Sequence, residues 1–129
     1  MSLFKVLGIA SSALGAQSVR MNTTASNLAN ADSVSSNVDN AYKSKQVVFE
    51  SMPDGKLKVS AIVESKQVPL RVYDPSHPLA DKEGYLTKSN VNPIEEMINM
   101  ISASRSYQTN VEVLNTTKQM ILKTLELGK

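Results

Sequence analysis

The sequence has no cysteine and only one histidine. Without cysteine the chain forms no disulfide bond, offers no thiolate ligand to a metal ion and has no thiol nucleophile. One histidine is too few for a site with several histidine ligands, and no Asp or Glu cluster has the spacing of a calcium-binding loop. A run of about 18 or more apolar residues is also missing, so we expect no segment that spans a membrane. These absences predict a chain that binds neither metal nor cofactor.

A strong charge of one sign is absent as well. The 14 Lys and Arg and the 12 Asp and Glu residues give a net charge of +2, and the basic residues are scattered along the chain. Proteins that bind nucleic acid gather their basic residues on one face, so nucleic acid is not an expected partner. With 129 residues, 41% of them hydrophobic and 20% charged, the chain has the composition of one folded domain.

The N-terminal residues share some features with a cleavable secretory signal. Lys5 precedes the stretch 6–16, which is rich in small and apolar residues. This stretch has few large aliphatic side chains, however, and its leucine spacing continues far beyond any cleavage site. We therefore expect the segment to remain part of the protein.

Residues 4–30 are predicted to form a helix with a narrow apolar stripe, because large apolar residues recur every seven positions. The other faces carry mostly Gly, Ala and Ser, so neighbouring helices can approach closely on several sides. Asn27, Asn30 and Asp32 are poor helix formers and predict an end near Ala31. The stripe consists of Leu7, Leu14, Met21 and Leu28, with Phe4, Ser11, Ser18 and Ala25 at the intervening positions.

A second helix is predicted over residues 93–127. Asn92 can cap its first turn, Pro93 suits its first position, and Glu95 follows the cap at the spacing of a capping box. Gly128 offers a stop. Its stripe runs through Met97, Met100, Ser104, Tyr107, Val111, Leu114, Lys118, Ile121 and Leu125.

Between the helices, the pattern predicts a small antiparallel β element. Apolar residues alternate with polar ones over residues 57–63, after a turn at residues 53–55. We expect residues 47–49 to be the hairpin partner of this strand and residues 68–72 to form a third strand. Residues 32–40 are predicted to be a surface loop.

The two predicted helices are too long for a small globule. They would measure roughly 40 and 52 Å at 1.5 Å per residue, whereas a compact domain of this size has a radius of gyration of about 14 Å. The β element is too small to bury them. The predicted fold class is α+β, with two long N- and C-terminal helices that pack as a coiled-coil hairpin and a small antiparallel β element inserted between them. Apolar surface left on the helices would need other protein chains.

No group of residues has the arrangement of a catalytic site. Asp74, Ser76 and His77 are close in the sequence, but prolines fix this segment as a turn, and a catalytic triad needs side chains from separate elements. We expect His77 to be a structural residue of the turn. The adjacent Glu95 and Glu96 point in different directions on a helix and cannot act as an acid–base pair on one bond. The chain is predicted not to be an enzyme and to have no small-molecule substrate.

Several segments resemble the flagellar axial proteins, the family of the bacterial rod and hook. Residues 25–33, Ala-Ser-Asn-Leu-Ala-Asn-Ala-Asp-Ser, are similar to the asparagine-rich motif near the N-terminus of that family. Within the family the chain resembles the C type of the proximal rod. That resemblance covers both ends and is carried by residues 16–23, 45–49, 77–81, 84–85 and above all 101–115, whereas residues 50–66 depart from it.

The resemblance implies a structural subunit of the proximal rod of the flagellar basal body. Such subunits polymerise into a helical tube that crosses the periplasm, transmits torque and lets later subunits pass through its lumen. They are exported unfolded by the flagellar type III apparatus, without a cleaved signal. The implied partners are other copies of the chain, other rod proteins, the export apparatus, and membrane-ring or adaptor proteins at the rod base.

In that family the terminal helices pack in the inner tube and the middle segment projects outward. For this chain the resemblance implies assembly helices over residues 1–31 and 92–129, with an outward loop and β element over residues 32–91. The residues expected at the assembly interface are Leu7, Leu14, Met21, Asn27, Leu28, Asn30, Met97, Met100, Tyr107, Val111, Leu114, Ile121 and Leu125.

Two alternatives stay open from the sequence. A coiled-coil adaptor or chaperone that binds one partner helix without polymerising also fits the two apolar stripes. Tyr107 suits either a core position within the chain or an anchor at an interface.

Overall fold

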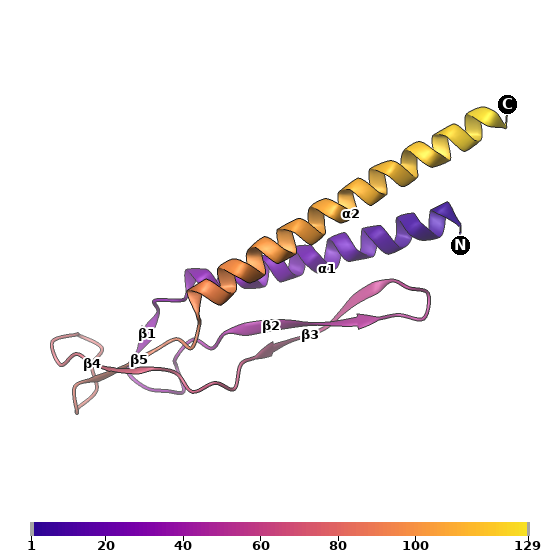
Figure 1. Cartoon of the computed structure of the whole chain (residues 1–129). Coiled ribbons are helices and arrows are strands. Elements are labelled where there is room, and N and C mark those ends of the chain that lie inside the picture. Colours follow the sequence, from indigo (N-terminus) through magenta and orange to yellow (C-terminus); the bar gives the residue numbers. More distant parts are fainter. Residues whose placement is uncertain (1, 129) are drawn as a thin grey trace.

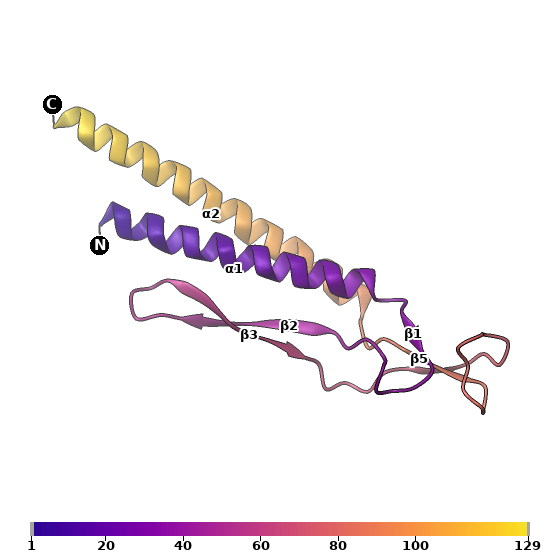
Figure 2. The same ribbon diagram turned by 180° about the vertical axis from the view of Figure 1, so that it is seen from behind.

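The computed structural model describes residues 2–128 as an elongated molecule of three layers (Figure 1). Helix α1 (Leu3–Ala29) packs against the longer helix α2 (Pro93–Leu127) on one side. On its other side lies a hairpin of β2 (Lys45–Ser51) and β3 (Leu57–Glu64), as Figure 2 also shows. Two helices that pack together with antiparallel strands between them in the sequence confirm the predicted α+β fold class.

The ends of both helices follow from local hydrogen bonds. The Ser2 hydroxyl accepts the N–H of Lys5 at the start of α1, and Asn30 caps its end, slightly before the predicted position. At the start of α2 the Asn92 side chain accepts the N–H groups of Ile94 and Glu95, at 3.1 and 3.5 Å. The predicted start of the second helix at residue 93 and its end at residue 127 are confirmed.

The β2–β3 hairpin turns at residues 52–56, as predicted. The N–H of Met52 donates to the carbonyl of Lys56 at 2.8 Å, and Gly55 has a φ of 88°. Glycine adopts this left-handed conformation without the steric cost that a Cβ atom adds. A Cβ at residue 55 would also lie 3.1 Å from the Cδ1 of Ile9, so the turn fits closely against α1.

A β-bulge changes which side chains of β3 face α1. Val48 pairs with Ala61 and Phe49 pairs with Val59, so Ser60 is an extra residue without a partner. The strict alternation predicted for residues 57–63 is therefore wrong beyond Val59. After the bulge Ala61 is exposed, whereas Leu57 and Val59 before it are half-buried.

A second sheet lies at the end of the molecule away from both termini (Figure 1). Its strand order is β1 (Val34–Ser35), β5 (Tyr85–Lys88) and β4 (Arg71–Tyr73), all antiparallel. The third strand predicted over residues 68–72 is present in part as β4, but it begins at Arg71 and pairs with β5 and not with β2 or β3. The predicted loop over residues 32–40 likewise contains the short strand β1.

The interior of the chain contains few large apolar side chains. Among residues 2–128, the buried hydrophobic residues are four alanines, Leu86 and Val91, and the largest fully buried side chain is that of Asn27. Small residues let helices approach closely, but they bury little apolar area. Many large apolar residues remain exposed on α2, and others are exposed on the β2–β3 hairpin, whereas α1 exposes Phe4. Neither helix within residues 2–128 is apolar over a length that could cross a membrane.

Candidate assembly surface

The contact between α1 and α2 runs along one stripe of each helix. On α1 the buried residues Ala10, Gln17 and Thr24 are seven apart, and half-buried large residues lie between them. On α2 Ala103 and Thr117 are buried on the same pattern. The buried positions of the α1 stripe, Ala10, Gln17 and Thr24, therefore lie one residue before the predicted Ser11, Ser18 and Ala25. This rotation follows from the position of α1, which is covered by α2 on one side and by the β2–β3 hairpin on the other.

The residues expected at the assembly interface fall into three groups. Most are half-buried along the two helices, so part of each side chain remains available to another chain. Two residues near the ends of α2 are exposed, and one residue of α1 is fully buried. The half-buried group comprises Leu7, Leu14, Met21, Leu28, Asn30, Met100, Tyr107, Val111, Leu114 and Ile121; Met97 and Leu125 are exposed; Asn27 is buried.

Asn27 binds within its own chain. Its side chain is 1% exposed, and its Nδ2 donates to the carbonyl of Lys45 at 2.8 Å. Its Oδ1 accepts the N–H of Lys45 and the hydroxyl of Tyr42, both at 2.9 Å. One carboxamide thus holds the start of β2 against the end of α1. The asparagine-rich motif at residues 25–33 could be recognised in the sequence, but spacing alone could not locate the partner of Asn27, which lies 18 residues further along the chain.

A cleft of about 340 Å³ lies where α1, β2 and the first turn of α2 meet. Arg20 of α1 donates to the Oδ1 of Asn99 at 3.4 Å along its edge, which also fixes the alignment of the two helices. Glu96 lines the same cleft and is nearly buried. Its carboxylate lies in the first turn of α2, where the helix dipole favours negative charge. At this cleft the Arg20–Asn99 hydrogen bond joins α1 to α2.

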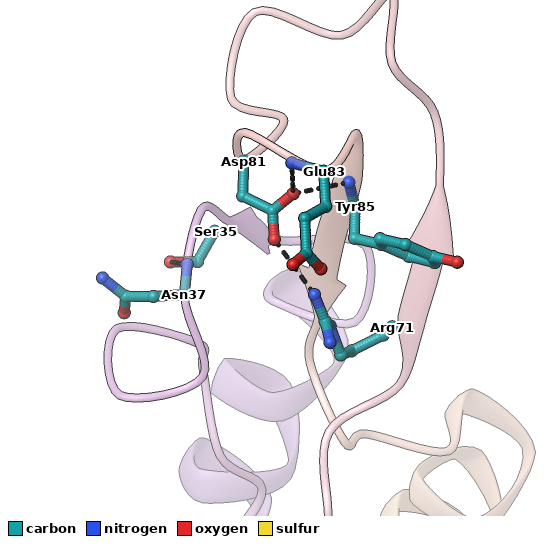
Figure 3. A network of polar contacts seen from close by, with 6 residues as sticks. All are labelled: Ser35, Asn37, Arg71, Asp81, Glu83 and Tyr85. Carbon is teal, nitrogen blue, oxygen red and sulfur yellow. Dashed lines mark hydrogen bonds and ion pairs between the residues drawn. The ribbon is translucent and has the colours of Figure 1, made fainter.

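The β4–β5 end of the molecule is organised around Asp81 (Figure 3). The carboxylate of Asp81 accepts the N–H groups of Tyr85 and Glu83, both at 2.9 Å, and pairs with the Arg71 guanidinium at 3.0 Å. The N–H of Tyr85 is the main cause that lowers the pKa of Asp81 below its ordinary value, and Glu83 and Arg71 add to it. Nearby, Gly84 has a φ of 87°, where a Cβ would lie 2.9 Å from the ring of Tyr73.

Two apolar surfaces of α2 are exposed. The first is the N-terminal patch, which consists of Ile94, Met97, Ile98 and Ile101. At the spacing of a helix these residues share one stripe, roughly opposite the buried Ala103. Further along that stripe the side chains are polar, so the patch is confined to the first turns of α2.

The second exposed apolar surface is the C-terminal overhang, residues 118–127 of α2. Because Arg20 lies opposite Asn99 and the helices are antiparallel, the start of α1 at Leu3 lies opposite residue 116. The overhang is therefore about 15 Å long at the rise of an α-helix. Figure 1 shows α2 continuing past the start of α1. Its exposed apolar side chains are Met120, Leu122, Leu125 and Leu127.

The turn that contains His77 is held by bonds within the turn. The His77 Nδ1 accepts the N–H of Leu79 at 3.1 Å, and the Ser76 hydroxyl donates to Asp74 at 2.6 Å. Between residues 2 and 128 no hydrogen bond joins the imidazole to either of these side chains. No group of three His, Cys, Asp or Glu side chains in this part of the chain is arranged to hold a metal ion.

Two family models match the chain. Residues 7–35, which include most of α1 and its asparagine-rich end, match the model of flagella basal body rod proteins. Residues 82–127, which include β5 and α2, match the model of the C-terminal region of flagellar basal body rod FlgEFG proteins. The matched segments contain most of α1 and all of α2, the two helices that pack together.

Similarity to individual proteins extends over the whole chain. The chain is 51% identical to the flagellar basal-body rod protein FlgC of Salmonella typhimurium and 52% identical to that of Escherichia coli O157:H7. It is 38% identical to the FlgC protein of Bacillus subtilis. Each of these alignments covers 100% of both chains. The chain belongs to the flagellar basal-body rod protein family and is of the FlgC type.

Proposed function

We propose that the chain is a structural subunit of the flagellar basal-body rod, and that it polymerises with other rod proteins into a helical tube. One observation supports the polymerisation above all. In residues 2–128 the buried apolar residues are mostly alanines, while α2 carries large exposed side chains such as Ile98 and Leu125, both 62% exposed. Contiguous exposed apolar surface of this kind is typical of sites that bind other proteins. Neighbouring subunits would bury it.

The proposal assigns a role to each part of the chain. Residues 1–31 and 92–129 form the inner layer of the tube around its lumen, and residues 32–91 project outward. This division is consistent with α1 and α2 packing together, with the β4–β5 end held by its own hydrogen bonds. The half-buried stripe residues and the exposed Met97 and Leu125 supply the contacts between subunits. Asn27 contributes indirectly, because it holds β2 to α1.

The location and remaining partners follow from the same proposal. The chain occupies the part of the rod that crosses the periplasm, where it transmits torque and lets exported subunits pass. It leaves the cytoplasm through the flagellar type III apparatus without losing its N-terminal segment. At the rod base it contacts the export apparatus and membrane-ring or adaptor proteins.

Mass spectrometry of purified basal bodies tests this function. The chain should copurify with the rod after the hook and filament are removed, and its N-terminal peptide should be intact. A mature chain that begins near Gln17 would show instead that residues before it are a cleaved secretory signal. Cells that lack the chain should build no rod beyond the membrane rings in electron micrographs.

The adaptor or chaperone alternative makes a different prediction. Such a protein would be absent from purified basal bodies and would form a complex of fixed size in solution. Light scattering against concentration, with other rod proteins present, separates the two functions, because a polymerising subunit grows in mass as concentration rises.

A further inference from the structure

Strands β3 and β4 each lie at the edge of a sheet. β3 pairs only with β2, and β4 pairs only with β5 in the sheet β1–β5–β4. The two strands follow one another along the length of the molecule (Figures 1 and 2). We propose that the edge of β3 in one copy pairs antiparallel with the edge of β4 in a second copy. This inference rests on the proposed function and adds to it a contact between copies that is made by strands.

The edges of the β2–β3 hairpin are covered where they lie against α1. The Asn27 side chain binds the N–H and the carbonyl of Lys45 at the start of β2. The Ser12 hydroxyl accepts the N–H of Leu57 at 3.0 Å at the start of β3. Beyond the bulge the cover ends, and residues 60–64 of β3 are all exposed. We call residues 60–64 the open edge.

The hydrogen bonds of the hairpin show which backbone groups of the open edge point outward. The N–H of Ser65 donates to the carbonyl of Ser44 at 2.7 Å. In an antiparallel pair, residues that bond to the partner strand alternate with residues whose backbone groups point away from it. Ile62 and Glu64 are therefore the outward residues. An exposed edge strand with free backbone groups and apolar side chains is a template for another strand.

β4 has an outward edge of the same length. The N–H of Asp74 donates to the carbonyl of Gly84 at 2.9 Å, so Asp74 and every second residue before it bond towards β5. Arg71 and Tyr73 therefore point their backbone groups away from β5. Each of the two edges has two outward residues separated by one, so the two edges can form a short antiparallel ladder.

Antiparallel pairing of these edges places complementary side chains opposite each other. Tyr73 of the second copy faces Ile62, and Arg71 of the second copy faces Glu64. Pairs of an aromatic and a β-branched residue, and pairs of opposite charge, stabilise a sheet. Within residues 2–128 Glu64 has no ion pair of its own. Parallel pairing would instead bring Arg71 towards Ile62 and Tyr73 towards Glu64.

A groove beside the open edge has room for the side chains of the second copy. The groove measures about 570 Å³ and lies between α1 and the hairpin. Ile62 and Glu64 both line it, and Val19 of α1 adds an apolar wall. Tyr73 is 63% exposed in its own copy, so its ring can enter the groove without uncovering a core. The groove thus receives Tyr73 beside Ile62 and Arg71 beside Glu64.

The symmetry of this contact agrees with a tube. A contact between two different edges of the same chain is heterologous, so each copy that joins leaves one free edge of each kind. Such contacts continue from copy to copy. Pairing of two β3 edges would close into a dimer and would leave Arg71 outside the contact.

Disulfide crosslinking tests the contact, since the natural chain has no cysteine. In the proposed register Val63 lies opposite Val72 of the second copy, with Cα atoms about 4.5 Å apart, which a disulfide can bridge. The variant with Val63→Cys and Val72→Cys replaces the natural chain in motile cells. Oxidation of purified basal bodies should yield a ladder of covalently linked copies that a reductant removes. A disulfide within one copy would yield no ladder.

A second variant and a matched control test the register. Ser65→Cys with Leu70→Cys joins the next pair of the same register, leaves the half-buried Val72 unchanged, and should also yield a ladder. The control combines Val63→Cys with Leu70→Cys. These positions are two residues out of register, about 7 Å along the strand, which puts their Cα atoms beyond the reach of a disulfide. The control should yield no ladder.

Glu64→Lys tests the charge pair. Added to the variant with Val63→Cys and Val72→Cys, it places a lysine opposite Arg71 and should lower the yield of linked copies by about threefold or more. The matched control is Glu50→Lys, because Glu50 is exposed on β2 away from the open edge. It should leave the yield unchanged.

Each other outcome overturns the proposal. No ladder from either pair, in basal bodies that contain the variant chains, would show that the two edges do not meet, while the role as a rod subunit would stand. A ladder from the out-of-register control, or equal yields from Glu64→Lys and Glu50→Lys, would refute the register. A crosslink to a different rod protein would show that the partner is not a second copy. Absence of the unmodified chain from basal bodies would overturn the proposed function together with this contact.

Discussion

The side-chain carboxamide of Asn27 forms hydrogen bonds with the backbone at the start of β2, as a neighbouring strand would do in a sheet. It binds both the N–H and the carbonyl of Lys45, which keeps these backbone groups paired next to a helix. No apolar side chain of similar size can do the same. This explains why the largest fully buried side chain in the described part of the chain is polar.

Replacement of Asn27 by alanine should destabilise the chain strongly. The change leaves the backbone of Lys45 and the hydroxyl of Tyr42 without their hydrogen-bond partner. Each buried polar group that lacks a partner destabilises the folded chain by about 1–3 kcal/mol. We expect Asn27→Ala to lower the free energy of unfolding by about 2–4 kcal/mol. Urea denaturation of the purified variants measures this.

The control is Asn22→Ala, since Asn22 is exposed on the same helix and should change the stability by no more than about 0.5 kcal/mol. Equal effects of the two variants would contradict the role of Asn27.

The contribution of Asp81 to the stability of the β4–β5 end depends on pH. Hydrogen bonds to its carboxylate lower the pKa in the folded chain relative to the unfolded chain. A lowered pKa adds stability above the unfolded pKa of about 4, and this contribution is lost as the pH falls through the folded pKa. NMR titration should therefore find the Asp81 midpoint below its ordinary value. In Arg71→Leu the pKa should rise only in part, because the N–H groups of Tyr85 and Glu83 remain. A midpoint in the natural chain at or above the ordinary value would refute this.

At the scale of elements, the helices could be predicted and the sheets only in part. The ends of α2 depend on Asn92, Pro93 and Gly128, which act on neighbouring residues, so local sequence is enough. The β2–β3 hairpin was predicted for the same reason, because its turn is local. The pairing of β4 with β5 joins segments separated by the loop 74–84, and no local pattern reports it. The Ser60 bulge likewise depends on how β3 fits against α1.

The candidate site shows the same division between local and distant information. Heptad spacing identified Leu14, Met21 and Leu114 on the helices, because a stripe is a property of one element. It did not reveal that Asn27 binds Lys45, or that α1 ends short of the α2 overhang. Both facts depend on how distant segments lie in space.

The overhang should behave as a separate part of α2 before assembly. Its backbone hydrogen bonds are open to water, and α1 does not cover it, so it frays easily in the isolated chain. Hydrogen exchange of dilute chain should find fast exchange over residues 118–127 and slower exchange around Ala103, which is buried against α1. In purified basal bodies the overhang should become protected. Equal protection of both segments in the dilute chain would show that the overhang is stable without partners.

At the scale of the whole molecule, the fold leaves a subunit that is incomplete by itself. The side chains that are fully buried between its layers are mostly alanines and polar residues, and most of its large apolar residues are half-buried or exposed. Removing apolar surface from water stabilises a protein by about 25 cal/mol per Å². The apolar surface that the monomer leaves exposed contributes this stabilisation when other subunits cover it. Stability and polymerisation are coupled in such a protein.

Leu114→Asp tests this coupling in the middle of α2. Leu114 is half-buried, so the new carboxylate would enter a contact from which water is largely excluded, at a cost of several kcal/mol (about 3–5). The defect recurs in every copy of a polymer, and we expect motility to be lost and rods to be absent from electron micrographs. Asn115→Asp is the matched control, because it adds the same charge at an exposed neighbouring position and should leave cells motile.

His77→Ala removes one hydrogen bond in a turn, should lower the free energy of unfolding by no more than about 1 kcal/mol, and should also leave motility unchanged. Normal swimming of the Leu114→Asp cells would show that this stripe of α2 is not packed in the rod, whereas loss of motility in His77→Ala cells with intact rods would give the turn a role beyond structure.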